Sequence, residues 1–168
     1  MVLIRSVYTK IFPHLDRILA LDNDTIVNKD ISELWDLDLT DYYMAGVRDT
    51  KKFNQNFLYV NVGSIMYNLD KIRADKKDEE GISILNYIRL EMPEQDLFNS
   101  IFRGKILELP SRYNSNPCFM NFTPLDRAIY HFAGDRTFPK HPLVKHYANL
   151  SYDDIYKYKK LISRSKHD

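Results

Sequence analysis

The feature that most constrains this chain is a short apolar run that ends in two carboxylates. Residues 17–21 are mostly branched aliphatic, and Asp22 and Asp24 follow them directly. A run of this length and composition predicts a buried β-strand. Alternation along an extended backbone would point the two carboxylates to the same side. The segment therefore predicts a strand whose end carries a pair of acidic groups.

Two neighbouring carboxylates at the end of a strand favour a cation between them, because like charges repel each other. Hard oxygen ligands suit Mg²⁺ or Mn²⁺, and the ligands of open α/β sheets gather where strands end. An Asp-x-Asp sequence is also common in solvated turns and helix caps. The pair alone leaves both interpretations open, and its position after a buried strand favours the metal site.

Composition limits the class of protein. The length of 168 residues fits one domain, and the 24 basic and 23 acidic residues give no indication of nucleic acid as a partner. The single cysteine, Cys118, excludes an internal disulfide. No segment has the pattern of a membrane span or a secretory signal, so we expect a cytoplasmic protein.

Strands and helices are expected to alternate, which predicts an α/β protein with a mainly parallel or mixed sheet. Asp30 and Glu33 have the spacing of a capping box, and a proline begins one helix. The predicted strands are residues 17–21, 44–47, 57–67, 106–109 and 128–132. The predicted helices are residues 3–12, 30–35, a stretch that begins at Asp70 and continues through 82–90, 93–102 and 152–162.

Further polar residues stand where predicted elements begin or end. Asp49 follows a strand, and Asn61 interrupts another beside Gly63, where only a small residue allows close approach. Gln95 and Asp96 lie in the first turn of a helix, whose free N–H groups favour anions. Polarity at a helix start has a purely structural explanation as well, so both interpretations stay open.

His131 lies near the end of the last predicted strand, shortly before Gly134. A single histidine in such a position is more often a hydrogen-bonded structural residue than a metal ligand. The sequence around it leaves its role open.

Taken in order, these segments resemble glycosyltransferase family 8, whose members are retaining hexosyltransferases with a nucleotide-sugar donor and a GT-A fold. The resemblance implies an α/β GT-A-like mixed sheet with flanking helices. It also implies transfer of glucose or galactose from a UDP-hexose to a glycan or glycolipid acceptor, in the synthesis of bacterial lipopolysaccharide or capsule. The matching segments are residues 21–27, 31–35, 61–63, 94–99 and 131–134.

The resemblance implies a role for each matching residue. A glutamine oxygen is a poor nucleophile because the amide is neutral, so the implied role of Gln95 is electrostatic support of an oxocarbenium-like sugar. The implied ligands of Mn²⁺ or Mg²⁺ are Asp22, Asp24 and His131. The residues implied in catalysis are Asp49, Glu94 and Gln95. Those implied in substrate binding are Arg5, Asp49, Asn61, Gly63, Asp96, Gly134 and Arg136.

The chain departs from the family pattern in two ways. The family's lysine after the histidine and glycine is missing, so we expect Arg136 or Lys140 to bind the diphosphate instead. Only 21 residues precede Asp22, where the family has about half a domain. We therefore expect a partial catalytic domain in residues 1–150 that lacks the first βαβ nucleotide-binding unit. An open sheet edge, self-association and weak or absent activity would follow.

Residues 151–168 are predicted to form a basic, tyrosine-rich tail around the last helix. Such a helix either packs on the domain or makes peripheral contact with the inner face of the cell membrane. Two alternative functions also remain at this point. One is a degenerate, non-catalytic subunit with a transferase fold. The other is a phosphohydrolase of the haloacid dehalogenase type, for which Gly134 and Asp135 are the only hint of the second acidic pair.

Overall fold

A computed structural model describes residues 4–49, 56–115 and 127–133. The chain divides into two compact units, residues 1–133 and 134–168, and the described residues all belong to the first. None of the helices in these described ranges has the length and hydrophobicity that crossing a membrane requires. The predicted boundary at residue 150 stays a prediction. Several residues and segments named above lie outside the described residues: Cys118, Gly134, Asp135, Arg136, Lys140, the predicted helix 152–162 and the tail 151–168.

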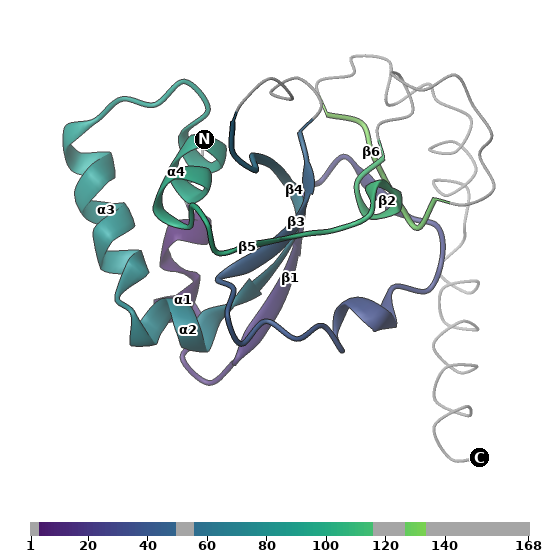
Figure 1. Cartoon of the computed structure of the whole chain (residues 1–168), viewed down its shortest axis with the longest axis horizontal. Coiled ribbons are helices and arrows are strands. Elements are labelled where there is room, and N and C mark those ends of the chain that lie inside the picture. Colours follow the sequence, from purple (N-terminus) through teal and green to yellow (C-terminus); the bar gives the residue numbers. More distant parts are fainter. Residues whose placement is uncertain (1–3, 50–55, 116–126, 134–168) are drawn as a thin grey trace. The chain divides into compact units, whose positions relative to one another are not determined.

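The described unit is built on a four-stranded mixed sheet with strand order β1-β4-β3-β5 (Figure 1). β1 and β3 each pair antiparallel with β4, and β5 pairs parallel with β3. β2 and β6 form a separate antiparallel pair. The strands are β1 (Arg17–Leu21), β2 (Thr25–Val27), β3 (Met44–Arg48), β4 (Val60–Asn68), β5 (Ile106–Glu108) and β6 (Ile129–His131). This architecture confirms the predicted α/β class with a mixed sheet.

The helices largely follow the prediction. The side chain of Asn68, rather than Asp70, caps α2 by accepting a hydrogen bond from the Lys71 N–H at 3.0 Å. The predicted capping box is wrong, because Glu33 instead pairs with Arg112 at 2.5 Å. The helices and 3-10 turns are η1 (Ile4–Val7), α1 (Tyr8–Ile11), η2 (Ser32–Leu34), α2 (Leu69–Ala74), α3 (Lys77–Tyr87), α4 (Pro93–Ile101) and η4 (Ser111–Tyr113).

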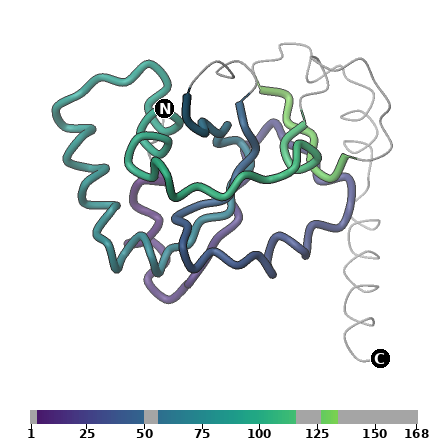
Figure 2. Tube along the Cα trace, viewed as in Figure 1, coloured from purple at the N-terminus to yellow at the C-terminus, as the bar shows by residue number. Residues whose placement is uncertain are grey.

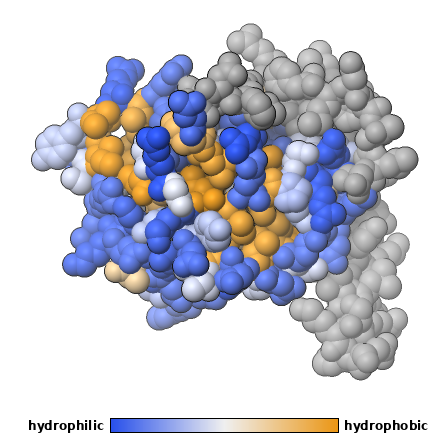
Figure 3. Space-filling view, viewed as in Figure 1, coloured by the Kyte–Doolittle hydropathy of each residue, from blue (hydrophilic) through white to orange (hydrophobic). Residues whose placement is uncertain are grey.

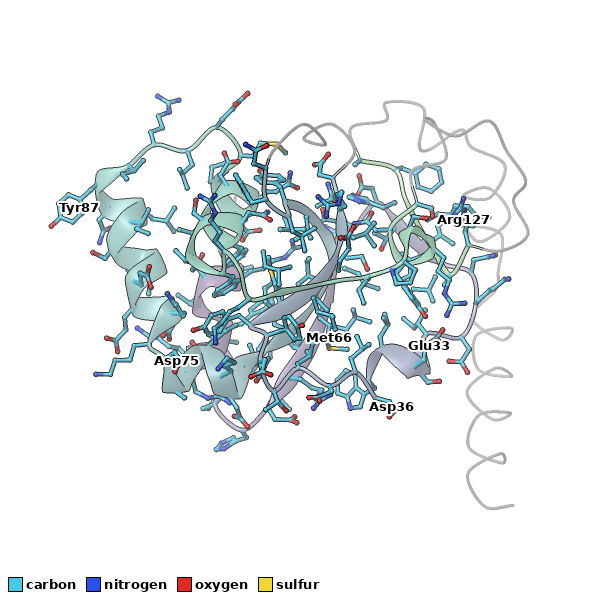
Figure 4. All side chains as sticks on the ribbon, viewed as in Figure 1. Glu33, Asp36, Met66, Asp75, Tyr87 and Arg127 are labelled. Carbon is cyan, nitrogen blue, oxygen red and sulfur yellow. The ribbon has the colours of Figure 1, made fainter. Side chains whose placement is uncertain are left out.

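Two apolar clusters cover the two faces of the sheet. Side chains of β3 and β4 such as Met44 and Tyr67 pack with α2 and α4 on one face. Met66 points to the other face, where it is fully buried with Leu34 from η2 and Ile129 from β6 (Figure 4). Burial of large apolar side chains contributes about 1.5–3 kcal/mol each, so both faces stabilise the sheet.

β4 contains an irregularity that changes the phase of its side chains. Gly46 of β3 pairs with Ile65, whereas the next residue, Val47, pairs with Asn61. Val62 and Ile65 consequently face the same apolar cluster, although strict alternation would put them on opposite faces. Bulges of this kind bend a strand and are common beside functional sites. Residues 62–64 therefore form a bend at the start of β4.

β1 is one of the two edge strands of the sheet in the part of the chain that the structure describes, and β5 is the other. Only Ala20 is buried, and the other four residues of the strand are half-buried. The prediction of strand 17–21 is confirmed, but its full burial is wrong because one edge of β1 has no neighbour among the described strands. This exposed edge agrees with the expectation of an open sheet edge.

Segments far apart in the sequence meet beyond the end of β1. Figure 2 shows β2 and β6 side by side, and their register pairs Thr25 with His131.

Some apolar side chains reach the surface, where they form a band between hydrophilic ones (Figure 3). Tyr87 is 86% exposed and points outward from the end of α3 (Figure 4).

Asn99 attaches α4 to β4. Its Oδ1 accepts from the Val60 N–H at 2.7 Å, and its Nδ2 donates to the carbonyl oxygens of Val60 and Gln95 at 2.8 Å each. The side chain is 1% exposed. The amide thus satisfies both backbone groups of Val60, which holds the last turn of α4 at a fixed place on the sheet.

Replacement of Asn99 by leucine should lower the free energy of unfolding by about 3 kcal/mol, because it leaves the buried Val60 N–H and C=O without partners. Chemical denaturation monitored by circular dichroism measures this change. Asn86→Ala, at an exposed position of α3, is the matched control and should stay within about 0.5 kcal/mol. Equal stability of N99L and wild type would contradict the role given to Asn99.

Candidate active site

Polar side chains converge at one edge of the sheet. β1 and β3 run in the same direction and antiparallel to β4, so the ends of β1 and β3 lie beside the start of β4. Asp22 follows β1, Asp49 follows β3, and Asn61 lies at the start of β4. The first turn of α4 adds Glu94 and Gln95 to the same edge, since Gln95 contacts both Asp49 and β4. The strand directions therefore bring the predicted site residues, which are far apart in the sequence, to one edge of the sheet.

Asp22, Asp24 and His131 form a compact cluster of donor atoms. Each offers one atom, and the three atoms lie within 4.8 Å of one another. His131 Nε2 is 3.3 Å from Asp24 Oδ1 and 3.5 Å from Asp22 Oδ2. Two carboxylates and one imidazole suit a divalent cation such as Mn²⁺ or Mg²⁺. The residues thus fit the ion that the resemblance implies.

Asp22 and Asp24 lie close together, but not because of the predicted alternation along an extended strand. After Asp22 the backbone turns, and the N–H and Oγ1 of Thr25 donate to the Asp22 carbonyl at 3.1 and 2.7 Å. The Phe132 N–H then donates to the Asp24 carbonyl at 3.0 Å. The tight turn and the β2–β6 pairing, rather than an extended backbone, bring Asp24 beside Asp22.

Gly63 makes room for the histidine ring. A Cβ atom at this residue would lie 2.0 Å from His131 Cε1 and 2.4 Å from Nδ1, far inside contact distance. The Gly63 carbonyl also accepts from the Asp22 N–H at 2.8 Å. The predicted need for a small residue is confirmed, and the group that approaches Gly63 is the imidazole of His131.

His131 is buried beside the two carboxylates. The residue is 3% exposed, and burial lowers its pKa, although the carboxylates of Asp24 and Asp22 oppose the shift. Its Nδ1 lies 2.9 Å from Asn114 Oδ1. A neutral imidazole with one nitrogen engaged by a partner has the form that metal ligands take. Asn114, which follows η4, carries no signal in the sequence and was missed.

Arg5 places a positive charge beside one oxygen of Asp22, Oδ1, whereas His131 faces the other oxygen, Oδ2. Its guanidinium contacts the Asp22 carboxylate and donates to the Val62 carbonyl at 2.7 Å. It also lies 3.7 Å from Glu94 Oε2. Burial raises the pKa of Glu94, and the Arg5 guanidinium works in the opposite direction. Arg5 therefore links the first carboxylate of the cluster to the start of α4.

Gln95 is held at both ends of its amide. Its Oε1 accepts from the Val62 N–H at 3.2 Å, and its Nε2 donates to Asp49 Oδ2 at 2.9 Å. The residue is 3% exposed and Asp49 is 9% exposed. These contacts fix the orientation of the amide before any ligand binds. The catalytic role implied for the pair stays a prediction.

Asp96 has two structural partners. Its Oδ1 accepts from the Tyr59 hydroxyl at 2.5 Å, and its Oδ2 accepts from the Met92 N–H at 2.8 Å, just before α4. These bonds hold the start of the helix against β4. A role of Asp96 in substrate binding stays a prediction.

Replacement of Gly63 by alanine should displace the His131 ring and lower the free energy of unfolding by about 1–3 kcal/mol through overpacking. Chemical denaturation gives the energy, and the NMR signals of the His131 imidazole report the displacement. Gly81→Ala is the matched control, because its Cβ would meet Ile101 Cδ1 at an ordinary 3.4 Å. The control should be about 1 kcal/mol more stable, since alanine favours the helix. An unchanged imidazole signal in G63A would contradict the packing argument.

Comparison with known proteins agrees with this arrangement. The chain is 30% identical over 134 residues to a Haemophilus influenzae protein named as a glycosyltransferase. This alignment covers 72% of the chain and 38% of that protein. It is 30% identical over 132 residues to the lipopolysaccharide 1,2-glucosyltransferase of Escherichia coli K12, which covers 66% of the chain and 38% of the enzyme. The chain thus spans less than half the length of these two relatives.

Solved structures share the fold. GlyE of Streptococcus pneumoniae superposes with a TM-score of 0.80 at 21% identity, over 98% of this chain and 47% of that one. Galactosyltransferase LgtC, solved with donor and acceptor sugar analogs, gives a TM-score of 0.64 at 25% identity, over 83% and 60%. The expected GT-A fold is confirmed.

The sequence model of one family, Glycosyl transferase family 8, matches residues 1–148. This match removes the alternative of a phosphohydrolase of the haloacid dehalogenase type. Because it spans every described residue of the site, the chain belongs to glycosyl transferase family 8.

Proposed function

We propose that this chain carries the metal and sugar-binding part of a retaining hexosyltransferase, which moves glucose or galactose from a UDP-sugar to a glycan or glycolipid. The observation that carries the proposal is the cluster of Asp22, Asp24 and His131, whose donor atoms lie within 4.8 Å of one another. Family membership makes a nucleotide sugar the substrate class that such a cluster would serve. The residues would hold Mn²⁺ or Mg²⁺.

Asp22, Asp24 and His131 would hold the divalent ion, which would supply positive charge against the negative charge that develops on the diphosphate leaving group. The protein's own contribution is to hold the ligands in place before binding. The turn after Asp22 fixes both carboxylates, and Gly63 fixes the ring of His131. Because these groups need little rearrangement, their electrostatic effect is available when the bond to the diphosphate breaks.

Gln95 is proposed to stabilise the positive charge that develops on the sugar. Its amide is oriented by Asp49 and by the Val62 N–H. The neutral amide is a weak nucleophile, but its dipole can stabilise an oxocarbenium-like sugar. The acceptor hydroxyl would enter on the face that the diphosphate leaves, which retains the anomeric configuration.

Support for the donor and the pathway comes from relatives. One is named a lipopolysaccharide glucosyltransferase and another a galactosyltransferase, which favours glucose or galactose and a bacterial surface glycan. Arg5 is proposed to contact the donor, since its guanidinium already bridges Asp22 and the start of α4. Arg136 or Lys140 is proposed to bind the diphosphate, and residues 151–168 to contact the membrane.

Replacement of Asp24 by asparagine should weaken Mn²⁺ binding by more than about 100-fold, because removal of a ligand should cost more than loss of an outer partner. Titration with Mn²⁺, followed by the electron paramagnetic resonance signal of the free ion, measures the affinity. Asp36→Asn, at an exposed carboxylate distant in sequence from the cluster (Figure 4), is the control and should bind as wild type does. Equal Mn²⁺ affinity in D24N would refute the proposed metal ligands.

Replacement of Gln95 by alanine should lower the turnover of UDP-glucose or UDP-galactose by about 100-fold, as loss of one preorganised electrostatic group does. Affinity for UDP should change little, because Gln95 acts on the sugar rather than on the diphosphate. UDP release measures turnover, and calorimetry measures UDP binding. Ser100→Ala, at an exposed position of the same helix, is the control.

The wild-type chain itself gives the deciding comparison for the alternative function. UDP release with either donor in the presence of Mn²⁺ supports the transferase. Binding of UDP-sugar that depends on Mn²⁺ but gives no release would favour a non-catalytic subunit. Normal turnover in Q95A would instead discard only the role given to Gln95.

A further inference from the structure

A chain of three hydrogen bonds connects the bend in β4 to the imidazole of His131. The Gly63 N–H donates to Asn61 Oδ1 at 2.9 Å. The same oxygen accepts from Asn114 Nδ2, also at 2.9 Å. Asn114 Oδ1 in turn lies 2.9 Å from His131 Nδ1. These groups come from β4, the segment after η4, and β6, so only the tertiary fold brings them together.

The direction of this chain is fixed from its backbone end. A backbone N–H only donates, so the Asn61 atom that faces Gly63 must be the carbonyl oxygen. The Asn114 atom that faces this oxygen must then be the amide nitrogen, which turns the Asn114 oxygen toward His131. A carbonyl oxygen only accepts, so His131 Nδ1 must carry the proton. Each amide has one orientation that satisfies all of its neighbours.

We propose that Asn114 is a positioning residue that, together with Asn61, sets the tautomer of His131. The Nδ1–H form leaves a lone pair on Nε2, the nitrogen that lies 3.3 Å from Asp24 and 3.5 Å from Asp22. The opposite tautomer would direct an N–H at these carboxylates and block the nitrogen. The expected effect of Asn114 on metal affinity rests on the proposed function, whereas its effect on the tautomer of His131 does not.

The backbone holds Asn114 against β6. The Ser115 N–H donates to the Ile129 carbonyl at 3.0 Å, and the His131 N–H donates to the Ser115 carbonyl at 2.9 Å. Ser115 also forms an isolated parallel bridge with Tyr130. These bonds fix the distance between Asn114 and His131. The absence of a Cβ atom at Gly63 allows the ring to lie in the orientation that this partner requires.

The tautomer can be observed without any metal. Long-range ¹H–¹⁵N NMR spectra of the full chain in metal-free buffer distinguish a protonated from an unprotonated ring nitrogen. The signals of His131 among the five histidines are those that disappear in His131→Gln. We expect the Nδ1–H form in wild type and a mixed or Nε2–H form in Asn114→Ala. A wild-type spectrum of the Nε2–H form overturns the proposal.

Two variants separate positioning from general structural damage. Asn114→Asp removes the donor to Asn61 Oδ1 but keeps an acceptor for Nδ1–H, so it should keep the proton on Nδ1 and bind Mn²⁺ within about tenfold of wild type. Asn114→Ala should bind Mn²⁺ about 10- to 100-fold more weakly, as loss of an outer hydrogen-bond partner of a ligand does. Asn28→Ala is the control, since Asn28 donates to the Arg127 carbonyl near β6. It should change neither the tautomer nor the affinity.

The outcomes distinguish this inference from the proposed function. If wild type binds no Mn²⁺, the proposed metal cluster fails, and the metal-free spectra still decide the tautomer. If wild type binds Mn²⁺ and N114A binds equally well with the same tautomer, the role of Asn114 is refuted while the metal cluster stands. If N114A does not fold, the wild-type spectrum and N114D decide, because loss of the Nδ1–H form in N114D also refutes the proposal.

Discussion

The contact between His131 and Gly63 is the constraint on which the candidate site depends. The ring occupies the space that any Cβ at residue 63 would fill, so β6 can deliver an imidazole to the end of β1 only over a glycine. The bend at residues 62–64 supplies this glycine and also the carbonyl that accepts from Asp22. One irregularity in β4 therefore positions a carboxylate and an imidazole together.

The polar groups around this contact lie on opposite sides of the Asp22 carboxylate. Asp22 and Asp24 bring two negative charges to a half-buried place, and Arg5 balances Asp22 from one side. His131, whose pKa is lowered by burial, faces both carboxylates from the other side. Arg5 holds the Asp22 carboxylate, Asn114 holds the His131 ring, and the cluster retains the donor atoms that a divalent cation requires. α4 belongs to the same network, because Arg5 contacts Glu94 and Gln95 contacts Asp49.

Local sequence predicted the elements but not how they pair. The run at residues 17–21 and the proline at residue 93 mark β1 and α4 correctly, because apolar patterning and helix starts are local properties. β2 was missed, since a three-residue strand exists only through its pairing with β6. The capping box failed because Arg112, distant in sequence, attracts Glu33. Asn114 was missed for the same reason: its partners lie on two other segments.

The sequence by itself determined the chemistry of this protein: two carboxylates after an apolar strand, a histidine shortly before a glycine, and the order of segments that marks the family. Side-chain chemistry and local propensity are carried by the residues themselves. The tertiary structure alone decided that Asp22, Asp24 and His131 share one place, that Gly63 accommodates the ring, and that Asn114 orients it. These relations depend on strand pairing between distant segments, which burial on both faces of the sheet stabilises and no local pattern encodes.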